Sequence, residues 1–243
     1  KPSEDLKHLV HSFWTHRNDT DQTESMQIFP DSFFKLIIEV SEGKIVAFFL
    51  TGLWPKETEI IIPPNTTVYG IKFKILAPEF IFQRELASLL QSHVDLASDF
   101  WDIEQMHFDS FKSVVAQLEN RILYFLSDTK KIQKQKLQLT QLLTATKGDI
   151  SAEEVSNQIT WSNRQINRYL NKYLGISLKT YLNIQKCYEA YIQIRSGKFF
   201  PEKGYYDQAH FIREIKKHTS YTPSELHKEQ NDRFIQLKNI KQK

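Results

Sequence analysis

The stretch "SAEEVSNQITWSNRQINRYLNKYLG" (residues 151–175) contains two helix starts separated by a short turn. Ser151 precedes Glu154 by three positions, and Ser162 precedes Gln165 by the same spacing, so each pair predicts a capping box. The closing glycine predicts the end of the second helix. Two short helices joined in this way predict a helix-turn-helix unit.

The second of these helices has one apolar and one polar face. Ile166, Leu170 and Tyr173 recur at helical spacing and predict a face turned to the core. Arginine can pair with guanine and asparagine with adenine, and the opposite face holds such residues and no acid: Asn163, Arg164, Asn167, Arg168 and Asn171. The pattern predicts a DNA-reading helix, although a solvated face of the same composition remains the alternative.

A second stretch, "DQAHFIREIKKHTSYTPSEL" (residues 207–226), predicts another short helix. Asp207 is a good N-cap, Phe211 and Ile215 form an apolar pair, and Thr222 with Glu225 predicts a capping box for the next helix. The polar face of the short helix carries Gln208, His210, Arg213 and Lys217. A long helix over residues 177–195 is predicted to join the two units.

The pieces "WSNRQINRYLNKYLGISLKTYL" and "GYYDQAHFIREIKKHTSYTPSEL" resemble the C-terminal DNA-binding domain of AraC-family transcriptional regulators, over roughly residues 130–227. The resemblance implies seven helices with two helix-turn-helix units, which read one face of DNA about one helical turn apart. It implies base contacts in the first unit from Arg164, Asn167 and Arg168, and in the second from Gln208, His210 and Arg213. It implies structural positions at Trp161, Ile166, Leu170, Gly175, Phe211, Ile215 and Pro223.

The segment "SGKFFPEKGYYDQ" departs from this pattern, because few residues separate Gly197 from Tyr205 and Pro201 is among them. A support helix before the second reading helix barely fits there. We therefore expect the second unit to be aimed less accurately than the first.

The charge is divided between two parts of the chain. Residues 1–128 hold 11 basic and 19 acidic residues, a net −8, whereas residues 129–243 hold 21 and 10, a net +11, which together give the +3 of the chain. This division predicts a sensor or dimerisation domain over residues 1–128 and a DNA-binding domain over 129–243. Phosphate contacts are expected from Lys172, Lys179, Lys216 and Lys217.

The first part reads as α+β, a small β sandwich or barrel with helices, and the second part as all-α. Short segments rich in β-branched and aromatic residues predict strands at 33–40, 44–54, 58–64 and 68–75. Helical spacing follows at 78–90 and 108–126. The pieces "HLVHSFWTHR", "IFPDSFFKLIIEV", "LTGLW" and "YGIKFKI" loosely resemble an uncharacterised domain found before such DNA-binding domains, which implies sensing or dimerisation.

The histidines do not predict a metal site. His8 and His11 are expected at a helix end, and His93 and His107 stand alone in the sequence. The aromatic residues could line a ligand pocket, but a core role is the more common one: Phe13, Trp14, Phe48 and Trp54. No cofactor and no metal are predicted.

The sequence therefore predicts a cytoplasmic, bacterial-type transcription regulator, an activator or a repressor, and not an enzyme. Double-stranded DNA is the expected partner; an unidentified small-molecule effector, RNA polymerase and a second copy of the chain are further candidates, and no membrane is expected. Cys187 has no histidine nearby and is not expected to be a nucleophile. The alternative is a ligand-sensing or protein-interaction module whose DNA binding has degenerated.

Overall fold

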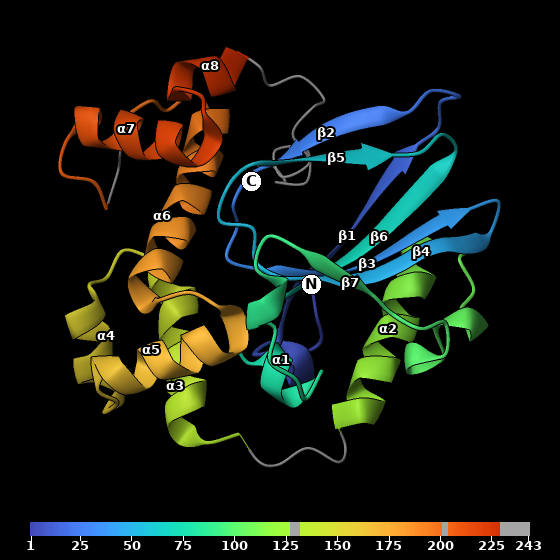
Figure 1. Ribbon diagram of the computed structural model, residues 1–243, viewed down its shortest axis with the longest axis horizontal. Coiled ribbons are helices and arrows are strands. Elements are labelled where there is room, and N and C mark those ends of the chain that lie inside the picture. Colours follow the sequence, from blue (N-terminus) through green and yellow to red (C-terminus); the bar gives the residue numbers. More distant parts are fainter. Residues whose placement is uncertain (127–131, 201–203, 229–243) are drawn as a thin grey trace.

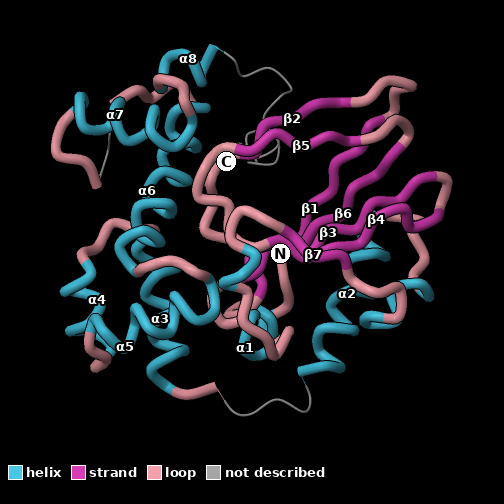
Figure 2. Tube along the Cα trace, in the orientation of Figure 1, coloured by secondary structure: helices cyan, strands magenta, loops and turns pink. Residues whose placement is uncertain are grey.

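The computed structural model describes residues 1–126, 132–200 and 204–228. An antiparallel β region is followed by a group of packed helices, as Figures 1 and 2 show. The predicted class, α+β followed by all-α, is thus confirmed. The expected domain boundary at residue 128 lies outside the described residues.

The β region consists of a five-stranded sheet and a two-stranded ribbon. The order in the sheet is β1 (Val10–Asn18), β6 (Thr66–Phe73), β3 (Phe34–Ser41), β4 (Lys44–Thr51) and β7 (His93–Asp95). The ribbon pairs β2 (Glu24–Ile28) with β5 (Thr58–Ile62).

The two faces of the sheet pack against different partners. Leu36, Ile71 and Phe73 belong to the main core, which also takes in the buried side of α2 (Phe111–Leu126). Ile37 points to the other face and packs with Met26 of the ribbon in a separate cluster. This alternation follows from the two-residue period of a strand.

The strands predicted over residues 33–75 are confirmed as β3, β4, β5 and β6. The expectation of a helix end holds for His8, which lies in the turn after a 3-10 helix, and is wrong for His11, which lies on β1. Most polar side chains of this strand are half-buried, so its sequence lacks clean alternation of apolar and polar residues.

The helix predicted over residues 78–90 is also wrong. Only α1 (Ala77–Phe80) forms there, followed by a single 3-10 turn at Ala87–Leu89. Phe80, Leu86 and Leu89 are buried, so their helical spacing reflects core packing of a loop. Two other 3-10 helices lie at Glu4–Leu6 and Phe100–Gln105.

The helical half begins at residue 134 and contains α3 (Lys134–Thr146), α4 (Ala152–Ile159), α5 (Asn163–Leu174), α6 (Leu178–Arg195), α7 (Gln208–Thr219) and α8 (Pro223–Lys228). Both predicted capping boxes are present at the starts of α4 and α5. Gly175 ends α5 in the left-handed conformation, with φ of 75°. Lys147 ends α3 in the left-handed conformation, with φ of 54°.

Among the described residues the helical half has six helices rather than the seven implied by the resemblance. The missing one is the support helix before α7, since the described part of residues 196–207 holds no helix. We call α4 with α5 the first unit, and α7 with α8 and the loop before α7 the second unit. They lie at opposite ends of α6, which at 1.5 Å per residue is about 27 Å long (Figure 1).

The two halves of the chain share one hydrophobic core. A single cluster of buried side chains runs from the sheet into α3, α4, α5 and α6. A second cluster joins Phe29 of the β region to Tyr191 of α6 and Phe211 of α7. In the described residues no helix is both long enough and apolar enough to cross a membrane.

Candidate nucleic-acid interface and junction cavity

The polar face predicted for the first unit is exposed on α5. Ile166 and Leu170 are fully buried on the opposite side, as expected for structural positions. Four of the five residues predicted on the reading face, and the predicted phosphate contact Lys172, are exposed to solvent: Asn163, Arg164, Arg168, Asn171 and Lys172. The helix contains no acidic residue, so this surface does not repel phosphate.

Asn167 differs from its neighbours because it is half-buried and its amide is bonded within the protein. Its Nδ2 donates to the carbonyl of Asn163 at 2.8 Å, and its Oδ1 accepts the Leu178 N–H at 2.9 Å. Leu178 begins α6, so Asn167 fixes the angle between the two helices.

In the second unit the polar face of α7 is exposed at Gln208, Arg213 and Lys217. Asp207 caps the helix by accepting the His210 N–H at 2.7 Å, as predicted. The His210 ring turns back toward the preceding loop, where its Nδ1 accepts the Tyr206 N–H at 3.2 Å. Phe211 and Ile215 are fully buried, and the Thr222–Glu225 capping box is formed in both directions.

Both units are attached to the β region, but through different contacts. The first unit is held by main chain, since the Leu86 N–H donates to the carbonyl of Tyr173 at 3.0 Å. An exposed ion pair, Lys172 with Glu85 at 3.4 Å, lies beside it. The second unit contacts the β region through side chains, since His218 Nδ1 lies 3.4 Å from the carbonyl of Pro55 and Phe29 shares a buried cluster with Phe211.

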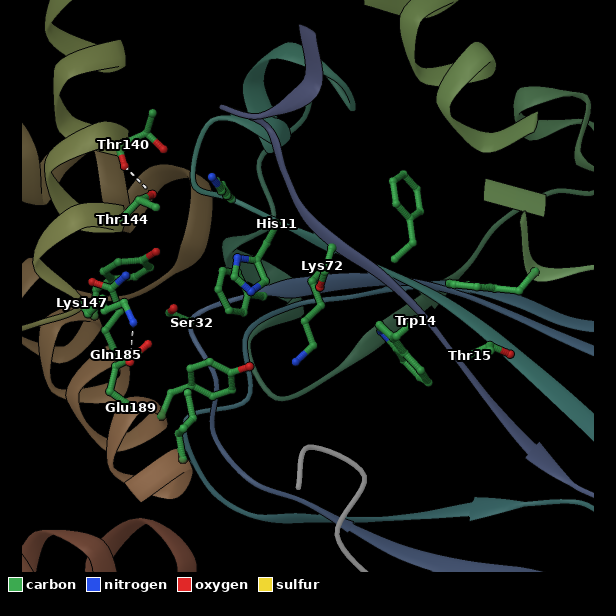
Figure 3. Close-up of a pocket in the computed structure, with 18 residues that line it drawn as sticks. His11, Trp14, Thr15, Ser32, Lys72, Thr140, Thr144, Lys147, Gln185 and Glu189 are labelled. Carbon is green, nitrogen blue, oxygen red and sulfur yellow. Dashed lines mark hydrogen bonds and ion pairs between the residues drawn. The ribbon is translucent and has the colours of Figure 1, made fainter. Parts of the chain in front are cut away.

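A cavity of about 530 Å³ lies where the sheet meets α3 and α6 (Figure 3). Its polar lining includes Lys72 of the sheet, Thr140 and Thr144 of α3, and Gln185 and Glu189 of α6. The cavity is therefore built from both halves of the chain. Its volume falls in the range usual for small-molecule sites.

Lys72 belongs to a buried group of three charges beside this cavity. The Asp31 carboxylate lies 2.7 Å from Lys35 Nζ and 2.9 Å from Lys72 Nζ, and the three side chains are at most 10% exposed. Lys72 Nζ also lies 5.2 Å from the ring centre of Tyr188 on α6. Burial opposes the charged form of Lys72, but Asp31 and Tyr188 outweigh it and raise its pKa.

His11 closes another side of the junction and stacks on Phe33, with ring centres 4.0 Å apart. Burial, followed by the charges of Lys72 and Lys74, lowers the pKa of His11 to about 4. His11 is therefore neutral near pH 7. The sequence could not reveal this junction, because Asp31, Lys72 and Tyr188 lie far apart in the chain.

Among the described residues, Cys187 is buried and the potential metal ligands are dispersed. Cys187 is buried near the Tyr205 hydroxyl, and burial raises the pKa of its thiol to about 12. Within residues 1–126, 132–200 and 204–228, no three histidine, cysteine or acidic side chains are placed to hold a metal. A second cavity of about 360 Å³ lies between the sheet and the ribbon, with Trp14 and Trp54 in its wall.

Residues 1–95 match a protein-family model described as a domain of unknown function, DUF6597. A search of curated proteins finds no match. The chain resembles solved structures of ToxT from Vibrio cholerae. One, in the P21 form, shares 11% identity at a TM-score of 0.48 and covers 88% of this chain and 97% of that one.

ToxT from Vibrio cholerae O395 shares 12% identity at a TM-score of 0.46, covering 91% of this chain and 99% of that one. ToxT from Vibrio cholerae strain SCE256 was solved with an unsaturated fatty acid bound. It shares 11% identity at a TM-score of 0.46, and the match covers 89% of this chain and 95% of that one. Because these TM-scores lie below 0.5, we derive the function from the chain's own geometry.

Proposed function

We propose that the protein is a sequence-specific, DNA-binding transcription regulator of the AraC type, in which residues 129–243 bind DNA and residues 1–128 modulate the binding. The observation that carries this proposal is the first unit: a capped helix-turn-helix whose second helix exposes Arg164 and Arg168 on a face without acids. Such a helix has the shape and the side chains to enter the major groove.

The experiment is a mobility-shift assay on the full chain at increasing salt, because the two halves share a core. Affinity for duplex DNA should fall steeply with salt, by about 0.9 in log K per unit of log salt for each phosphate neutralised. The double variant Arg164→Ala/Arg168→Ala should lose sequence preference. The matched control is Arg84→Ala, an exposed arginine of the N-terminal half, which should bind as the wild type does.

A second candidate function is a sensing or interaction module with degenerate DNA binding. The absence of a support helix from the described part of the second unit favours it. The same assay separates the two, since the second candidate predicts no affinity for any duplex at low salt.

The modulation proposed for the N-terminal half requires an effector, and the junction cavity is the proposed site. Lys35 and Lys72 face one carboxylate. Burial lowers the pKa of Lys35, whereas the pKa of Lys72 is raised, so the group carries a net positive charge when Lys35 also keeps its proton. Buried charge is costly unless it is paired. Glu189 is the acid that lines this cavity, and it is already paired with Lys147 at 2.7 Å. We propose that a small organic anion supplies the missing charge.

The effector proposal is tested by thermal unfolding of the full chain with acetate or benzoate at constant ionic strength, and with neutral benzamide. The anions should raise Tm, by about 5–10 °C at 100 times Kd, and benzamide should not. Lys72→Met should abolish the rise, whereas Lys147→Met, an exposed lysine of the same cavity, should keep it. A rise that persists in Lys72→Met would rule out this site.

The same proposal implies a bacterial, cytoplasmic protein that catalyses no reaction. RNA polymerase and a second copy of the chain are further proposed partners. Whether the protein activates or represses its targets would follow from the position of its binding sites relative to the promoter.

A further inference from the structure

The side chains of α5 are not equally placed to meet DNA. An α-helix turns by about 100° per residue. Taking the buried residues Ile166, Tyr169, Leu170 and Leu174 as one side, Arg164 and Arg168 fall in the middle of the opposite side. Asn167 falls at the edge between the two sides, and Asn163, the first residue of the helix, falls on the side of the buried residues although it is exposed.

Three of the four amide side chains of α5 are bonded within the protein at one end or at both. Pairing with adenine needs both ends of an asparagine amide, and both ends of Asn167 are bonded, one of them to the start of α6. Gln165 Oε1 accepts the N–H of Ser162 at 2.9 Å in the capping box. Asn171 Nδ2 donates to the carbonyl of Asn167 at 2.8 Å.

The two guanidinium groups are different. In the part of the chain that the structure describes, no hydrogen bond or ion pair engages the side chain of Arg164 or Arg168, and both are exposed. They are one helical turn apart, about 6 Å along the axis. Arginine pairs in bidentate fashion with O6 and N7 of guanine.

We infer that the first unit recognises a pair of guanines through Arg164 and Arg168. Asn167 does not read adenine in this arrangement, because its amide holds the start of α6 against α5. The inference rests on the proposed function, since it requires α5 in the major groove. Base pairs rise by about 3.4 Å, so side chains 6 Å apart reach base pairs that are adjacent or separated by one. The specificity of this half-site therefore comes from guanine.

The test uses the full chain in two steps. Binding sites are first selected from a pool of random duplexes, and each guanine of the selected half-site is then replaced by 7-deazaguanine, which lacks the N7 acceptor. Two guanines should each lose about 5- to 150-fold in affinity on replacement. In Arg164→Ala one of these replacements should have no further effect, and in Arg168→Ala the other. The control Arg84→Ala should retain both losses.

A selected half-site that is insensitive to 7-deazaguanine overturns the inference while leaving the proposed function intact. An adenine preference that disappears in Asn163→Ala or Asn171→Ala overturns it as well. Absence of binding to every duplex refutes the proposed function, and this inference with it.

Discussion

The two reading units have the same local construction but different support. Each reading helix starts at a side-chain cap, Ser162 in α5 and Asp207 in α7, and each buries an apolar pair one turn apart. In the first unit, however, α5 packs against α4, and the Tyr173 carbonyl of α5 accepts a main-chain hydrogen bond from the β region. The second has no helix in the described part of the segment before α7, and it contacts the β region through His218 at Pro55 and through the cluster that joins Phe29 to Phe211.

This difference shows that a side-chain cap does not by itself fix the orientation of a helix. Caps fix where a helix begins, whereas its orientation depends on packing and on hydrogen bonds to other elements. A helix held by fewer contacts must be ordered further when it binds DNA, which reduces affinity. We therefore expect the first unit to set sequence preference and the second to add affinity.

The largest effect should come from the core of the second unit. Phe211 is fully buried against α6, and Phe211→Ala should cost about 3–5 kcal/mol of stability. Hydrogen exchange should show loss of protection in α7 while α5 stays protected. Tyr206→Ala, at a side chain 93% exposed, is the control and should change neither helix. Equal loss of protection in both reading helices would contradict the assignment of α7 to a buried cluster separate from that of α5.

Acid should lower the stability of the protein through His11, which lies at the junction of the sheet with α3 and α6. The pKa of His11 is lowered to about 4 in the folded protein, mainly by burial, against an ordinary value of about 6.5. The unfolded chain then binds the proton more readily, so stability should fall as pH drops from about 6.5 to about 4, by about 3 kcal/mol in total. Denaturant unfolding of His11→Phe should show a shallower fall. The exposed His107→Phe should follow the wild type, and an unchanged slope in His11→Phe would contradict this assignment.

A smaller effect is expected from Asn167, which links the reading helix of the first unit to the start of α6. Asn167→Ala leaves the Leu178 N–H without its partner and should cost about 1–3 kcal/mol. Asn171→Ala removes only an exposed bond to helix carbonyl and should stay within about 0.5 kcal/mol. Thermal unfolding of both variants decides the matter, and equal shifts in Tm would mean that Asn167 has no special structural role.

The smallest effect concerns His218. Burial lowers its pKa, so the folded state favours the neutral ring beside Pro55. As pH falls below about 6.5, the ordinary pKa, the cost of protonating this ring should loosen the last turn of α7 but leave α5 unchanged. Hydrogen exchange at several pH values measures this. His218→Gln should remove the pH dependence in α7, and a response of equal size in α5 would argue against a contact specific to the second unit.

The sequence predicted the helical half well because helix ends are local. Ser151, Ser162 and Asp207 each cap a helix whose start could be read within four residues of sequence. The sequence also indicated that the support helix of the second unit barely fits. The β region was harder to predict from the sequence. In β1, half-buried polar residues obscure the alternation of apolar and polar side chains that marks a strand.

The candidate site was predicted only in part. The exposed arginines of α5 follow from helical periodicity alone. The engagement of Asn167 does not, because its partner Leu178 belongs to the next helix and the angle between them is a tertiary property. The junction cavity brings together Asp31, Lys72 and Tyr188 from distant parts of the chain, and no local pattern marks them.

Hydroxyl-radical footprinting of the full chain and its single variants on a selected binding site compares the two units on one DNA. We predict that Arg164→Ala or Arg168→Ala abolishes the preference for the selected site over random DNA. Arg213→Ala should instead weaken binding evenly across sequences. If Arg213→Ala erases protection of one half-site while Arg164→Ala leaves the other intact, then α7 and not α5 is the helix that reads the sequence.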